Sequence, residues 1–150
     1  MTIGLHLCVD IDRTPAQVWA AIERIETHVE WMADAVSITF RTQQRTGVGT
    51  EFACRTRLGP FHTTDVMTVT EWEANKVIGI EHRGVVTGSG RFTLTPATGT
   101  SFCWTEDLRF PWWMGGPAGE RAARPLLRRV WLRNLARLRT IVERQSRPRL

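Results

Sequence analysis

The chain has 150 residues, of which 42% are hydrophobic, a size and composition that fit one domain with a buried core. We therefore expect a single domain over residues 1–150. The net charge of +5 is uneven, because residues 117–150 carry ten arginines and two glutamates while the first 116 residues are slightly acidic. Asp10 and Asp12 stand where a signal peptide would need a long apolar run, so we expect a cytoplasmic protein.

The three cysteines give a second indication of compartment. Cys8, Cys54 and Cys103 are odd in number, far apart, and each lies within an apolar run. This pattern is typical of buried free thiols in a reducing compartment. We expect no disulfide.

The N-terminal region predicts a strand followed by two short helices. Residues 3–12 alternate between apolar and polar, the period of a strand with one buried face. Thr14 and Gln17 have the spacing of a capping box at the start of a helix, and Thr27 with Glu30 repeats that spacing. A second short helix is therefore expected from Thr27 onward.

Residues 34–110 consist of strand-length segments separated by turn signals. These signals lie at residues 47–49, 59–60, 73–76, 84–88 and 96–99. The segments predict six strands. Short connections favour hairpins, because parallel strands would need crossovers of a dozen or more residues, so the sheet should be antiparallel.

An aromatic segment separates the last strand from a long helix. It contains Phe110, Trp112, Trp113 and Met114, and two glycines and a proline then break the chain. Apolar side chains from residue 127 to residue 142 fall on one side of the following helix and arginines on the other. A helix of some 25 residues spans roughly 38 Å, enough to cross the whole sheet.

The order of elements and five local sequences resemble the START/Bet v 1-like (SRPBCC) superfamily, in its polyketide cyclase/dehydrase branch. These sequences are TPAQVWAAI (14–22), GVGTEF (47–52), VTEWEANKVIGIEHRG (69–84), GSGRFTLTPATGTSFCWTEDL (88–108) and WLRNLARLRTIVE (131–143). The resemblance implies an α+β helix-grip fold, a curved seven-stranded antiparallel sheet wrapped around the C-terminal helix, with two short helices after the first strand. It also implies a largely apolar cavity between sheet and helix, with the aromatic segment near its mouth. The alternative is that this segment fills the core where the last strand meets the helix.

Strand alternation predicts two polar side chains that face inward, His82 and Glu106. An imidazole and a carboxylate in an apolar cavity could act as acid and base for a cyclisation or dehydration. The alternative is that both bond backbone or water at the ends of their strands. The expected ligand-binding residues are Phe52, Cys54, Ile80, His82, Phe92, Trp104, Glu106, Trp112, Trp113, Trp131 and Asn134.

Asn134 and Cys54 are the two members of that set without an aromatic, aliphatic or charged side chain. Asn134 lies within the apolar side of the long helix, so its amide needs a partner. This partner could be a ligand, a buried water or a loop backbone group. We interpret Cys54 as part of the cavity wall rather than a nucleophile, because no neighbouring residue in the sequence is available to activate it.

Other chemistry is not indicated by the sequence. No Cys or His pair has metal-ligand spacing, and the glycine segments fit no nucleotide-binding motif. We expect no metal and no cofactor. The chain lacks tyrosine, so a cyclase mechanism that relies on a phenolic acid lacks its residue here. The arginine-rich face is interpreted as the solvated side of a helix, so no nucleic-acid partner is expected.

The predicted function is the binding of a hydrophobic small molecule, such as a polyketide, lipid or quinone, between sheet and C-terminal helix. Three alternatives stay open. The first is a polyketide cyclase/dehydratase-type enzyme that uses His82 and Glu106 without metal or nucleotide. The second is a membrane-associated quinone or lipid chaperone with transient membrane-surface contact. The third is an interaction module that docks through residues 110–114, with the protein a monomer or a homodimer.

Overall fold

The computed structural model describes residues 3–145. The elements follow the expected order: β1 (Ile3–Ile11), α1 (Pro15–Ile22), the 3-10 helix η1 (Ile25–Glu30), β2 (Ala35–Phe40), β3 (Glu51–Leu58), β4 (Phe61–Glu73), β5 (Val77–Arg83), β6 (Thr87–Pro96), β7 (Thr100–Arg109), the 3-10 turn η2 (Trp112–Met114) and α2 (Gly116–Gln145). This is the α+β helix-grip arrangement that the sequence predicts. The expected domain of 1–150 also includes residues 1–2 and 146–150, which lie outside the described residues.

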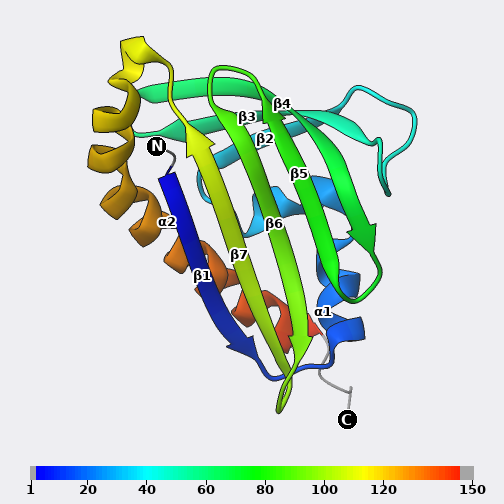
Figure 1. Cartoon of the computed structure of the whole chain (residues 1–150). Helices are drawn as coiled ribbons and strands as arrows, with labels where there is room; N and C mark the ends of the chain where they lie inside the picture. The colour runs from blue at the N-terminus through cyan, green and yellow to red at the C-terminus, as the bar shows by residue number, and fades with distance from the viewer. Residues whose placement is uncertain (1–2, 146–150) are drawn as a thin grey trace.

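One antiparallel sheet of seven strands forms the frame, in the order β1-β7-β6-β5-β4-β3-β2. The first and last strands are therefore neighbours, and β1 pairs with β7 along its whole length. In Figure 1, α2 starts beside the end of β7 and crosses behind the strands towards α1. The main core fills the space between sheet and helix, where Trp31, Phe102 and Leu138 are almost completely buried.

The two short helices differ in how they begin. Thr14 and Gln17 form the predicted capping box at the start of α1. The predicted second capping box does not form, because the Thr27 hydroxyl donates to the Arg24 carbonyl instead. As a result the second helix is a 3-10 turn that begins at Ile25, two residues before the expected start.

The long helix α2 buries the predicted apolar side. Leu127, Trp131, Leu135, Leu138 and Val142 are all buried, while the arginines of the opposite side face solvent. Among residues 3–145, no helix is both long and apolar enough to cross a membrane.

The expectation of three buried free thiols is wrong for two of the cysteines. Cys8 and Cys103 form a disulfide between β1 and β7, where they stand directly opposite each other. Strand alternation turns Leu7 and Trp104 into the core, so the adjacent cysteines point to the outer face of the sheet. Cys54 is buried and free, as expected.

Candidate functional site

A cavity of about 180 Å³ lies between the sheet and α2. Most of its wall is apolar and comes from the inward-facing positions of β3 to β7, closed by η1, the segment before α2, and α2 itself. The apolar wall includes Ile25, Met32, Ile38, Phe52, Leu58, Phe61, Met67, Ile78, Ile80, Val86, Phe92, Trp104, Leu108, Phe110, Met114, Leu127 and Trp131.

The cavity brings together most of the residues that the sequence predicts for the site. The wall includes Phe52, Cys54, Ile80, His82, Phe92, Trp104, Glu106 and Trp131. Trp112, Trp113 and Asn134 are not part of it. For these three residues, the predicted contact with a ligand stays a prediction.

The two tryptophans point outward because of the local turn. Trp112 and Trp113 are 87% and 61% exposed, since they occupy the 3-10 turn η2, which Gly115 ends in a left-handed conformation. Their neighbours Phe110 and Met114 contribute to the wall instead. The aromatic segment therefore meets the cavity through its two ends and presents its tryptophans to solvent.

His82 and Glu106 form the polar centre of the cavity. His82 Nε2 donates to Glu106 Oε2 over 2.9 Å, and the two side chains are only 10% and 6% exposed. They come from β5 and β7, which are separated by β6. Gly90 of β6 pairs with Glu106 on one side and, on the other, with Ile80, two residues before His82. Because Gly90 has no side chain, the carboxylate can reach across the intervening strand.

A tryptophan fixes the other oxygen of the carboxylate. Trp104 Nε1 donates to Glu106 Oε1 over 2.9 Å. The Trp104 ring also stacks on Trp131 of α2, with ring centroids 4.7 Å apart. Helix, indole, carboxylate and imidazole are therefore linked in one chain of contacts across the cavity.

The surroundings of His82 favour its protonated form. Burial lowers the pKa of His82, but the hydrogen bond to Glu106 and the negative charges of Glu106 and Asp65 outweigh that effect and raise it above 6.5. The hydrogen bond of the pair therefore contains a proton that a ligand oxygen could share. The site can donate this proton to a bound ligand, either in a hydrogen bond or in acid catalysis.

Asn134 has partners within the protein. Its side-chain amide donates to Asp34 Oδ1 over 2.8 Å, and its carbonyl oxygen accepts from the backbone N–H of Ala33 over 3.1 Å. Trp131 Nε1 donates to the other oxygen of Asp34 over 3.2 Å. Of the three partners considered from the sequence, the structure shows the loop backbone, together with a carboxylate that the sequence analysis did not single out. These bonds tie α2 to the loop before β2.

Two buried ionisable residues of the wall, His28 and Asp65, were not predicted from the sequence. His28 donates through Nε2 to the carbonyl of Ile22 over 2.7 Å, and burial lowers its pKa to about 4. It is therefore a neutral imidazole at neutral pH. Asp65 accepts from the backbone N–H groups of Val85 and Val86 and holds the loop between β5 and β6. Asp65 alternates with the inward-facing Met67 and Val69, a signal that could have identified it, whereas His28 carries no comparable signal.

Cys54, the free thiol in the wall, is a poor nucleophile. Burial raises the pKa of Cys54 to about 11, aided by the charges of Asp34 and Asp65 and opposed by a contact with Thr56. The thiol form therefore dominates at neutral pH, and nucleophilic chemistry needs the thiolate.

The fold and the cavity together define a helix-grip protein with an internal, mainly apolar site. A sequence profile of the family described as “Polyketide cyclase / dehydrase and lipid transport” matches residues 4–143, so the chain belongs to this family. A search of curated proteins finds no significant match.

Solved structures with the same fold span almost the whole chain. The protein TTHA0849 from Thermus thermophilus is 15% identical, with a TM-score of 0.78 over 96% of this chain and 99% of that one. Zhui aromatase/cyclase from Streptomyces sp. R1128 is 16% identical, with a TM-score of 0.77 over 98% and 97%. The di-domain ARO/CYC StfQ from the steffimycin biosynthetic pathway is 10% identical, with a TM-score of 0.79 over 97% of this chain and 52% of that one. At these identities the likeness concerns the fold.

Proposed function

We propose that the chain binds a hydrophobic small molecule in this cavity, with a polar group of the ligand directed at His82 and Glu106. The observation that carries the proposal is an apolar wall with one buried, proton-holding pair at its centre. Such a combination suits a ligand with an apolar body and a carbonyl or hydroxyl group. Family membership supports the same class of ligand.

The size of the cavity limits what its interior can hold. An apolar cavity of about 150 Å³ is enough to bind benzene, and the present one measures about 180 Å³. The interior therefore accommodates roughly one ring with its polar substituent. A longer ligand extends towards the wall formed by Phe61, Phe110 and Met114, of which Phe61 is 70% exposed.

Native mass spectrometry of the freshly purified protein is the first test. An adduct of a few hundred daltons that leaves on denaturation identifies a resident ligand. If the native mass is that of the bare chain, binding is tested with a naphthalene-based fluorescent probe. Probe binding should be lost in Ile80→Phe, which fills the cavity, and kept in Val36→Phe, a matched substitution at an exposed position. Equal binding by both variants would contradict the proposal.

Acid-base catalysis by the same pair is the second candidate, favoured by the 2.9 Å contact and the raised pKa of His82. One structural neighbour is described as an aromatase/cyclase. On this hypothesis His82→Ala abolishes turnover of a short linear β-polyketone while its binding affinity stays nearly intact. Exposed His62 supplies the control substitution, His62→Ala. Turnover that is the same in both variants would rule out the catalytic role.

A further inference from the structure

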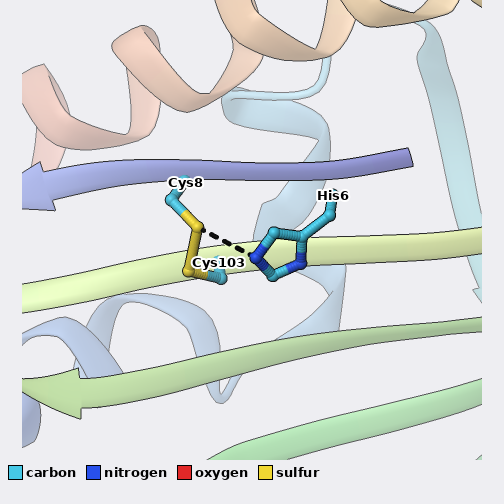
Figure 2. Close-up of side chains that lie close together, drawn as sticks. All are labelled: His6, Cys8 and Cys103. Carbon is cyan, nitrogen blue, oxygen red and sulfur yellow. Dashed lines mark hydrogen bonds between the residues drawn. A yellow bond between two sulfur atoms is a disulfide. The ribbon is translucent and has the colours of Figure 1, made fainter.

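We propose that His6, Cys8 and Cys103, with the cysteines reduced, form a binding site for a thiophilic metal ion such as Zn²⁺ on the outer face of the sheet. This site lies on the opposite side of β1 and β7 from the cavity. Figure 2 shows the three side chains together, with the His6 ring beside the sulfur of Cys8.

The register of β1 against β7 places the three metal-binding side chains close together. Cys8 of β1 pairs with Cys103 of β7, and His6 pairs with Thr105. The intervening Leu7 and Trp104 point into the core, so the four paired residues share the outer face. Both strands are fixed by continuous backbone pairing, which makes this a rigid platform rather than a loop.

The three potential ligand atoms are close enough to hold one ion. His6 Nε2 lies 3.4 Å from Cys8 Sγ, and all three atoms lie within 4.8 Å of one another. Zinc binds sulfur at about 2.3 Å and imidazole nitrogen at about 2.0–2.1 Å, so two ligand atoms of one ion lie about 3.5–4 Å apart. Two thiolates and an imidazole are a ligand set that zinc prefers, and three protein ligands leave one position open to water.

A neighbouring hydroxyl fixes the orientation of the imidazole. Thr105 Oγ1 lies 2.8 Å from His6 Nδ1, so the ring is held with Nε2 towards the sulfurs. Imidazole ligands of metals are usually oriented in this way, by a hydrogen bond to the nitrogen that does not bind the ion. This contact is a feature that a structural disulfide alone would not need.

The disulfide and the metal site exclude each other. In the disulfide the sulfurs carry no thiolate. A dithiol reductant can supply two electrons and two protons to the pair and is itself oxidised to a disulfide. The reduced pair can then bind Zn²⁺ and release its two thiol protons to solvent. A search for metal-ligand spacing along the chain misses this group, because Cys103 follows Cys8 by 95 residues. Among residues 3–145 it is the only such cluster of ligand atoms, and this proposal revises the expectation that no metal binds.

The test measures metal binding by the full chain in both redox states. The protein is reduced with a phosphine, freed of reductant without oxygen, and titrated with Zn²⁺ against a chromophoric chelator and with Co²⁺ for its thiolate charge-transfer band. We expect one ion per reduced chain and none per oxidised chain. Cys8→Ser and Cys103→Ser should lose the Co²⁺ band, and His6→Ala should bind at least tenfold more weakly. His62→Ala, an exposed histidine on β4, should behave as the unmodified protein.

The contribution of the Thr105 hydroxyl to Zn²⁺ affinity is tested separately. Thr105→Val keeps the shape but removes the hydroxyl, and should weaken Zn²⁺ binding by about 10–100-fold while circular dichroism shows an intact fold. Reduced protein that binds Zn²⁺ no better than Cys8→Ser would overturn the proposal. A disulfide that resists reduction in the folded chain would overturn it equally. Probe binding in the cavity is a separate measurement, so the two proposals can fail independently.

Discussion

Gly90→Ala tests whether an absent side chain on β6 makes the polar centre of the cavity possible. A Cβ at Gly90 would lie 2.4 Å from Oε1 of Glu106, 2.5 Å from its carboxyl carbon and 2.6 Å from Oε2. The carboxylate would have to swing away. It would then lose its hydrogen bonds to His82 and Trp104, both in a buried environment.

The expected cost follows from those two bonds. Hydrogen bonds to a charged group contribute about 1.5–3 kcal/mol each, so losing both costs about 3–6 kcal/mol. Replacing glycine by alanine in a strand recovers about 0.5–1 kcal/mol. Gly90→Ala should therefore lower the free energy of unfolding by about 2–5 kcal/mol.

Urea unfolding followed by tryptophan fluorescence measures this cost, with Gly4→Ala as the matched control. Gly4 is also a strand glycine, and its Cβ would meet only Asp107 Oδ1 at an ordinary 3.5 Å. In the Glu106→Ala variant the added methyl group has no carboxylate to displace, so the cost of Gly90→Ala should largely disappear. The reasoning is refuted if Gly90→Ala costs no more than Gly4→Ala, or costs the same with and without the Glu106 carboxylate.

Three further predictions concern pH and membranes. The pKa of His28 is about 4 in the folded chain against an ordinary value of 6.5. Between these two pH values the unfolded chain therefore binds more protons than the folded chain. The free energy of unfolding should be highest above pH 6.5 and should fall by about 3 kcal/mol as the pH drops towards 4. His28→Gln should remove this loss in urea titrations, and an unchanged pH dependence would contradict it. The pKa of His82 is raised in the folded chain, so the stabilisation by protonated His82 is fully present below pH 6.5 and is lost as the pH rises through the raised pKa. Glu106→Gln should flatten this part of the plot of unfolding free energy against pH. A plot as steep as that of the unmodified protein would count against the pairing of His82 with Glu106. Exposed Trp112 and Trp113 near the arginines of α2 predict co-sedimentation with anionic liposomes that is lost in Trp112→Ala/Trp113→Ala, and a complete lack of binding at low salt would remove the membrane hypothesis.

The sequence could place His82 and Glu106 on the inward face because strand alternation is a local property with a period of two. It could not reveal that they touch, because their contact depends on Gly90, a residue of a third strand whose register is set by the whole sheet. The same limit explains the error over Cys8 and Cys103, which meet only because the first and last strands become neighbours. The apolar residues around each cysteine suggested that its side chain is buried. In the structure both side chains instead lie on the outer face of β1 and β7, where they are close enough to form a disulfide.

Trp112 and Trp113 illustrate a different limit. Adjacent large apolar residues suggested contact with a ligand near the cavity mouth, because exposing them forgoes burial worth roughly 1.5–3 kcal/mol each. The 3-10 turn that carries them turns their side chains away from the cavity. A turn of three residues has no periodicity from which the orientation of a side chain can be predicted.

Glu106, Asp65 and Glu120 are buried and Asp34 is half-buried, but these carboxylates hold different segments, and this difference favours a functional role for Glu106. Asp65 holds the loop between β5 and β6, and Glu120 holds the backbone of Phe110 before α2. Asp34 ties the loop before β2 to α2. Each of these segments lacks a strand partner of its own, so the carboxylate is needed to position it. Glu106 instead joins β7 to β5, and continuous backbone pairing through β6 already holds both strands. Its contact with His82 therefore adds stability but is not needed to position either strand, and a ligand can take over that hydrogen bond while the backbone pairing keeps both strands in place.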